Sequence, residues 1–279
     1  MIRFLIADSE TTDQREQRRR TSGLSSAESY ADTLRTISPG AICDIARPHE
    51  AGCALPGPLG GYHGVFLSGS PLHVYDDTPE TRRQLAFMRA VFASGTPSFG
   101  SCAGLQVAVA AAGGDVAKSS RHEVAIARRI TATDAGRRHP LLADRPAVWD
   151  ALAIHSDFVA RLPPGATLLA GNKLCPIQAA EIRFDNGVFW GVQYHPELTP
   201  QEIADALERQ SDDIIEQGLA RSEADVSGQS ARLRALGDDP ARDDLAWCLG
   251  VDTEITDPVK RRRELANFIQ THCLIRAAA

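Results

Sequence analysis

The stretch TPSFGSCAGLQVAVAAAGG, residues 96–114, decides the fold of this chain. A short apolar run ends in the small-residue segment Gly100-Ser101-Cys102-Ala103-Gly104, and an alanine-rich helical pattern follows directly. A strand-to-helix turn this sharp holds its central residue in a strained conformation, and small neighbours let the helix pack close to the strand. The segment therefore predicts a nucleophile elbow with Cys102 at its tip.

Short apolar runs bounded by turn residues recur around this elbow, and they are typical of strands buried on both faces. They occupy residues 2–7, 41–46, 65–67, 96–99, 124–130, 167–170 and 188–193. Helical patterns lie between them, at residues 26–36, 81–94 and 105–112. The alternation predicts an α/β fold with a largely parallel sheet flanked by helices.

The pattern changes near residue 198, which predicts an α/β domain over residues 1–198 and a helical C-terminal extension over 199–279. Thr199-Pro200-Gln201-Glu202 combines an N-cap, a first-turn proline and a capping-box glutamate. Further helix starts are expected at Asp239-Pro240 and Asp257-Pro258. Leu265, Phe268, Ile269 and Cys273 share one helical face. We expect the extension to pack against the α/β domain; docking of a partner is the alternative.

Composition and charge are those of an ordinary globular protein, with 43% hydrophobic and 24% charged residues and a net charge of −6. The mild negative charge does not indicate a nucleic-acid partner, and the basic runs at 18–20 and 260–263 are expected to be solvated. No run approaches the roughly 18 apolar residues of a membrane span. The N-terminus also lacks the apolar core of a secretion signal. We therefore expect a cytoplasmic protein without a membrane partner.

Six cysteines, at positions 43, 53, 102, 175, 248 and 273, contain no C-x-x-C pair. Their spacing predicts neither a metal site nor a disulfide framework, and no cofactor is indicated. At a helix N-terminus, Cys102 would be favoured as the thiolate that attacks a carbonyl carbon. The other five cysteines are expected to be buried and structural.

A thiolate nucleophile needs a base, and the base needs an orienting partner. The segment GVQYHPEL, residues 191–198, supplies His195 and Glu197 at the end of a predicted strand. The loop Ser68-Gly69-Ser70-Pro71 follows another predicted strand. Backbone N–H groups of Gly69 and Ser70, with that of Ala103, are candidates for an oxyanion hole.

The order of these segments resembles the class I (triad) glutamine amidotransferase family, and particularly the amidotransferase domain of GMP synthetase. The resemblance spans roughly residues 1–198 and implies the flavodoxin-like fold of that family. Gly100, Cys102, Gly104 and Gln106 match the family's G-x-C-x-G-x-Q motif, and residues 195–197 match its closing H-P-E.

The resemblance also implies which residues bind substrate. Gln106 would contact the glutamine portion of the substrate. Ile154-His155-Ser156-Asp157 resembles the family's S-H-G-D segment, which implies that His155, Ser156 and Asp157 contact the α-amino and α-carboxylate groups. The sequence departs from the family's S-G-G-P loop, because Ser70 replaces a glycine. It also contains neither a G-x-x-x-x-G-K-[ST] phosphate loop nor an S-G-G-x-D-S segment.

The activity that this resemblance implies is hydrolysis of the glutamine side-chain amide to glutamate and ammonia, through a γ-glutamyl thioester on Cys102. The ammonia would pass to a separate synthetase subunit. A γ-glutamyl peptide hydrolase with the same triad is one alternative, and a non-catalytic interaction module is another. The matches at Gln106 and at His155 to Asp157 favour free glutamine.

Overall fold

A single mixed sheet organises this computed structural model, which describes residues 1–70 and 72–278. Its strands are β1 (Arg3–Ala7), β2 (Ile42–Ala46), β3 (Gly64–Leu67), β4 (Ser98–Ser101), β5 (Asp115–Ala132), β6 (Val148–Arg161), β7 (Ala166–Gly171), β8 (Ala179–Phe184) and β9 (Gly187–Val192). Their order is β2-β1-β3-β4-β9-β8-β7-β5-β6. Neighbours from β2 to β9 pair in parallel, and those from β9 to β6 pair antiparallel. The predicted α/β class is confirmed.

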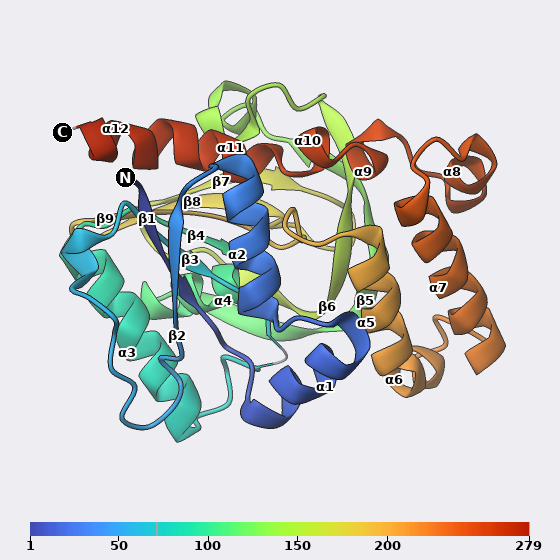
Figure 1. Cartoon of the computed structure of the whole chain (residues 1–279), viewed down its shortest axis with the longest axis horizontal. Helices are drawn as coiled ribbons and strands as arrows, with labels where there is room; N and C mark the ends of the chain where they lie inside the picture. Colours follow the sequence, from blue (N-terminus) through green and yellow to red (C-terminus); the bar gives the residue numbers. More distant parts are fainter. Residues whose placement is uncertain (71, 279) are drawn as a thin grey trace.

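Helices cover both faces of the sheet (Figure 1). They are α1 (Thr12–Ser22), α2 (Ser26–Ile37), α3 (Pro79–Ser94), α4 (Ala103–Ala111), α5 (Pro200–Arg209), α6 (Ser211–Glu216), α7 (Glu223–Asp238), α8 (Asp243–Leu249), α9 (Thr253–Thr256), α10 (Pro258–Arg261), α11 (Arg263–Phe268) and α12 (Leu274–Ala278). In Figure 1, α5 to α8 group beside β5 and β6, while α9 to α12 run along the top. The C-terminal helices that the sequence predicted are therefore present.

Successive side chains of β1 point to opposite faces of the sheet, and a separate hydrophobic core lies on each face. Phe4 and Ile6 face a core that includes α2 and α11, whereas Leu5 and Ala7 face a second core built with α3 and α4. A third core joins the antiparallel strands β5 and β6 to α5 and α7. The site lies where the parallel strands end, between these layers.

The last helices complete the first core. Leu265, Phe268, Ile269 and Cys273 are buried in it, and the Phe268 ring lies 5.5 Å from that of Phe66. Behind them, the buried guanidinium of Arg145 pairs with Glu264 at 2.7 Å and with Glu254. The shared apolar face at residues 265–273 thus packs as expected.

One predicted helix start is wrong. Pro240 was expected to open a helix after Asp239, but α7 ends at Asp238 and α8 begins at Asp243. Proline is also common just after a helix C-terminus, because it cannot continue the helix. That is its position here.

No helix in the described part of the chain combines the length and the apolar character that crossing a membrane requires.

Candidate active site

Cys102 sits at the tip of the turn between β4 and α4, with φ 53° and ψ −112°. This conformation is rarely adopted by residues other than glycine. Two glycines make the turn possible: a Cβ on Gly100 would lie 2.7 Å from the backbone of Gly104, and one on Gly104 would lie 2.6 Å from the Leu67 carbonyl oxygen. The N–H of Cys102 donates to the Val192 carbonyl at 2.8 Å, which ties the turn to β9.

His195 and Glu197 follow the end of β9, and their side chains meet over Cys102. His195 Nδ1 lies 2.7 Å from Glu197 Oε1, and His195 and Cys102 line the same cavity. Both residues are buried. Burial lowers the pKa of His195, but the charges of Glu197 and then of Cys102 outweigh it and raise that pKa to about 10. The arrangement favours the imidazolium form of His195.

Elements distant in sequence fix this pair. The N–H of His195 donates to the Leu152 carbonyl of β6 at 2.8 Å, and Thr33 Oγ1 of α2 donates to the Glu197 carbonyl at 3.1 Å. Pro196 between them restricts the backbone. The sheet and α2 therefore hold the base and its carboxylate in register with the elbow.

The three predicted oxyanion-hole residues lie around Cys102. A Cβ on Gly69 would lie 2.8 Å from His195 Cε1 and 3.8 Å from Cys102 Cβ, so only glycine fits there. Among the described residues, the N–H groups of Gly69 and Ser70 have no acceptor. Ala103 opens α4, where helix N–H groups lack intrahelical partners. Pro71, the last residue of the loop motif, lies outside the described residues.

The four residues assigned to substrate binding are brought together beside the elbow. Gln106 Nε2 donates to the Asp157 carbonyl at 3.0 Å. His155 Nδ1 donates to the same carbonyl at 2.9 Å, while Ser156 Oγ lies 3.5 Å from Asp157 Oδ1. Gln106, His155 and Asp157 are buried, and all four line the cavity over Cys102.

Three residues of this site escaped the sequence analysis. Gln193 Nε2 lies 3.6 Å from Cys102 Sγ, and Gln193 Oε1 accepts a hydrogen bond from Gln106 Nε2 at 3.3 Å. Gln193 therefore connects the candidate nucleophile to a candidate substrate-binding residue. His73 Nδ1 lies 2.5 Å from Asp157 Oδ2, and the Tyr75 hydroxyl donates to Asp157 Oδ1 at 3.1 Å. His73 and Tyr75 come shortly after the predicted oxyanion loop in the sequence. This position is the only feature of the sequence from which their place in the site could have been predicted.

A second buried polar cluster surrounds Glu123 and includes His155. His155 Nε2 is 2.9 Å from Glu123 Oε2. The Glu123 carboxylate also accepts hydrogen bonds from Asn172 Nδ2 at 2.6 Å and from Gln178 Nε2 at 2.5 Å. Donor atoms of Glu123, His155 and Cys175 lie within 4.8 Å of one another, close enough to share a metal ion. Burial, however, raises the pKa of Cys175 to about 12, and its thiol donates to the Ile177 carbonyl. The chemistry of these donors fits a hydrogen-bonded support for His155.

The remaining cysteines differ from one another. Cys175 and Cys273 are buried, as expected, and burial raises the pKa of the Cys273 thiol to about 12. Cys43 is half-buried, whereas Cys53 and Cys248 are exposed, so the expectation of burial is wrong for these two. Cys53 lies in the segment between β2 and β3, and Cys248 lies on α8.

The cavity over Cys102 has a volume of about 780 Å³ and extends well beyond the substrate residues. On its far side it is lined by Glu10, Arg18 of α1, and Arg209 of α5. Arg18 was expected to be solvated. That expectation is wrong, because its side chain is 12% exposed and pairs with Glu202 at 3.1 Å.

The comparisons with known proteins identify one family. The sequence model of the family described as glutamine amidotransferase class-I matches residues 42–211, more than half of the chain. The chain is 34% identical, over 258 residues, to a gamma-glutamyl-L-1-hydroxyisopropylamide hydrolase from Pseudomonas sp, covering 90% of this chain and 87% of that protein. It is 32% identical, over 200 residues, to the glutamine-hydrolyzing GMP synthase of Salmonella typhimurium, covering 69% of this chain but only 36% of that enzyme.

Solved structures share the fold. A glutamine amidotransferase from Thermotoga maritima superposes with a TM-score of 0.64 at 16% identity, covering 97% of this chain and 99% of that chain. A glutamine amidotransferase from Methylobacillus flagellatus gives a TM-score of 0.58 at 20% identity, covering 99% and 92%.

Proposed function

Because this chain belongs to the class I glutamine amidotransferase family, we propose that it hydrolyses γ-glutamyl amides with Cys102, His195 and Glu197 as its catalytic triad. The observation that carries the proposal is the meeting of two separate segments, the turn between β4 and α4 and the residues that follow β9. The strained elbow at Cys102, the buried His195 and its 2.7 Å contact with Glu197 come together in one cavity.

The first step is attack by the Cys102 thiolate on the γ-carbonyl carbon of the substrate. The developing oxyanion would be stabilised by N–H groups of Gly69, Ser70 and Ala103. His195 then gives its proton to the leaving nitrogen, the carbon–nitrogen bond breaks, and a γ-glutamyl thioester remains. The high pKa of His195 supports this role, because the imidazole holds the proton that the amine must receive.

The second step returns the enzyme to its starting state. His195, now neutral, takes a proton from water, and the hydroxide attacks the thioester carbon. The carbon–sulfur bond breaks and glutamate leaves. Glu197 keeps the imidazole oriented through both steps and balances its charge.

Recognition of the γ-glutamyl group is assigned to the side of the cavity opposite His195. Gln106 and His155 converge on the Asp157 carbonyl, which fixes all three residues. Ser156 and the Asp157 carboxylate, which His73 and Tyr75 hold in place, would then meet the α-amino group. The side-chain oxygen of Gln106 would meet the polar α-substituents.

The motif matches at Gln106 and at His155 to Asp157 favour glutamine as the substrate. The ammonia would then be released to a separate synthetase subunit. A γ-glutamyl amide of a larger amine is the second candidate. It is favoured by the 34% identity over 90% of the chain to a hydrolase whose name describes a hydroxylated γ-glutamyl amide. The match to GMP synthase covers only 36% of that enzyme.

A parallel assay of glutamine and γ-glutamyl amides tests the proposal. We expect His195→Ala to lower kcat by several orders of magnitude with every substrate, and Glu197→Ala to lower it less, because an orienting group contributes less than the base it orients. Wild-type enzyme inactive on all of these substrates, or a Glu197 variant more damaged than the His195 variant, would contradict the assignment.

A further inference from the structure

The active-site cavity has room that glutamine does not fill. Clefts of roughly 300–1,000 Å³ hold drug-sized ligands, and this one has about 780 Å³. Gln106, His155 and Asp157 line one side, and residues of α1, α2 and α5 line the other. A small substrate bound at the first side leaves the second side unused.

The unused side is the side of the leaving group. His195 must face the leaving nitrogen to protonate it, and Gly69 packs directly against the His195 ring. Ser26 Oγ of α2 donates to the Gly69 carbonyl at 3.4 Å, and the N–H of Ser26 donates to Glu10 Oε2 at 2.8 Å. Glu10 is therefore linked through Ser26 and Gly69 to the part of the cavity that His195 lines.

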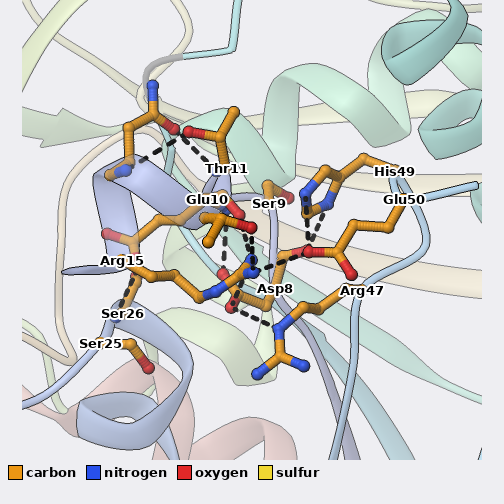
Figure 2. Close-up of polar contacts among 12 residues, drawn as sticks. Asp8, Ser9, Glu10, Thr11, Arg15, Ser25, Ser26, Arg47, His49 and Glu50 are labelled. Carbon is orange, nitrogen blue, oxygen red and sulfur yellow. Dashed lines mark hydrogen bonds and ion pairs between the residues drawn. The ribbon is translucent and has the colours of Figure 1, made fainter. Parts of the chain in front are cut away.

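Glu10 is fixed in place by its neighbours (Figure 2). Its N–H donates to Asp8 Oδ1 at 3.0 Å, and its carbonyl accepts from Arg15 Nη1 at 2.5 Å. Arg15 is buried and held in turn by Glu50 at 2.7 Å. The backbone and the side chain of Glu10 are thus held in one position before any ligand binds. Binding residues need such preorganisation by their neighbours.

One carboxylate oxygen of Glu10 is left for a ligand. Glu10 is only 5% exposed, yet it lines the cavity. No described residue donates a hydrogen bond to its Oε1. Arg18 Nη1 forms a long ion pair with that oxygen at 3.9 Å, while Arg18 Nη2 donates to Glu202. Burial raises the pKa of Glu10, against the opposing effects of the Ser26 N–H and Arg18. A desolvated carboxylate with an open oxygen gains most from a ligand that donates a hydrogen bond.

We propose that Glu10 forms a leaving-group subsite that selects γ-glutamyl amides whose amine carries its own hydrogen-bond donor, a hydroxyl or an ammonium group. This inference rests on the proposed function and adds its substrate class. Ammonia would leave the subsite empty, and a purely alkyl amine would leave Oε1 of Glu10 without a hydrogen-bond donor.

The test compares three amides that differ in one group: γ-glutamyl isopropylamide, its hydroxylated analogue and its amino analogue. In Glu10→Gln, the side-chain oxygen can still accept from Ser26, while an amide N–H replaces the open acceptor. We expect wild-type kcat/KM to favour the donor-bearing amides, and Glu10→Gln to lower that preference about tenfold. Glu16→Gln, on the exposed face of α1, is the matched control and should keep the preference.

The outcomes separate the two proposals. Activity on the amides with an unchanged preference in Glu10→Gln overturns the subsite and leaves the triad standing. Wild-type activity on glutamine but on none of the three amides also overturns the subsite alone, whereas inactivity on glutamine and on all three amides overturns the triad assignment as well. A loss of preference for only one of the two analogues identifies which donor the site accepts.

A second readout needs only wild-type enzyme. With γ-glutamyl p-nitroanilide as donor, a free amine can attack the thioester on Cys102; the carbon–sulfur bond breaks, the amide bond forms, and His195 takes the amine proton. The amine that carries a hydroxyl should intercept the thioester about tenfold better than isopropylamine at equal free-base concentration. Equal interception by the two amines would overturn the subsite.

Discussion

At the residue scale, the proposed chemistry depends on Cys102 having an environment that no other cysteine shares. Cys102 lines a cavity together with His195, whereas Cys175 and Cys273 are buried with raised thiol pKa values, and Cys53 and Cys248 are exposed outside that cavity. Thiolate character and access together decide reactivity.

We therefore expect a glutamine-mimicking electrophile to label Cys102 rapidly and the other five cysteines slowly. Peptide mapping after brief exposure measures this, and excess glutamine or a γ-glutamyl amide should protect Cys102. Iodoacetamide, which is not guided by the site, should in addition modify the exposed Cys53 and Cys248. Rapid labelling of Cys53 or Cys175 by the substrate mimic would refute the choice of nucleophile.

The charged state of His195 should also appear as a dependence of stability on pH. Its pKa rises from 6.5 in the unfolded chain to about 10 in the folded protein. The folded state therefore binds a proton more tightly, and the resulting stabilisation is complete below pH 6.5 and is lost as pH rises through 10. We expect the Tm of wild-type protein relative to His195→Gln to fall over that interval. A constant or rising difference would show that His195 is not held as an imidazolium.

At the element scale, the elbow depends on how closely α4 approaches β3. Gly104→Ala would bring a methyl group within 2.6 Å of the Leu67 carbonyl oxygen, and backbone on both sides leaves little room to relax. We expect a loss of about 1–3 kcal/mol in unfolding free energy, typical of overpacking, and a fall in kcat because Cys102 shifts.

Denaturant unfolding and steady-state kinetics measure both effects. Gly60→Ala is the matched control, because a Cβ there meets nothing within 4 Å and the backbone does not adopt positive φ. A Gly104 variant as stable and active as the Gly60 variant would mean that the close approach of α4 is not needed.

The elbow was predictable because its signal is local. Glycines at 100 and 104 around one cysteine require a strand–turn–helix, and the structure has that turn at these positions. The strand limits were less accurate: β4 covers 98–101 instead of 96–99, because Pro97 cannot donate to the sheet ladder. β6 was missed entirely. Its alternation is interrupted by His155, Ser156 and Asp157, whose polarity serves the site.

Helix α1 was not predicted, and Glu10 and Arg18 were missed with it. Its sequence, TDQREQRRRTS, has almost no apolar residue, so periodicity gives no signal. Only the capping box of Thr11 and Gln14 marked its start. Arg18 is buried by pairing with Glu202, which is 184 positions away in the sequence. Contacts over such distances have no local pattern to be predicted from.

At the scale of the whole molecule, the division into residues 1–198 and 199–279 stays a prediction, and the packing indicates how closely the two parts depend on each other. Phe268 lies against Phe66, Phe99 and Trp190, which belong to strands of the central sheet. Leu233 and Leu249 pack in one core with Leu152 of β6. Both groups of C-terminal helices therefore cover apolar surface of the sheet.

Truncation before Thr199 should consequently leave a chain that aggregates or fails to fold, because it exposes the apolar surface that α5, α7 and α11 cover. Phe268→Ala tests the same contact in the full chain, and we expect it to cost about 3–5 kcal/mol in unfolding free energy. Phe184→Ala is the control, because the Phe184 ring is partly exposed, and it should lower the unfolding free energy much less. A soluble truncate that keeps amide-hydrolysing activity would instead identify residues 199–279 as a separable element. Loss of binding to a partner protein in that truncate would identify it as a docking element.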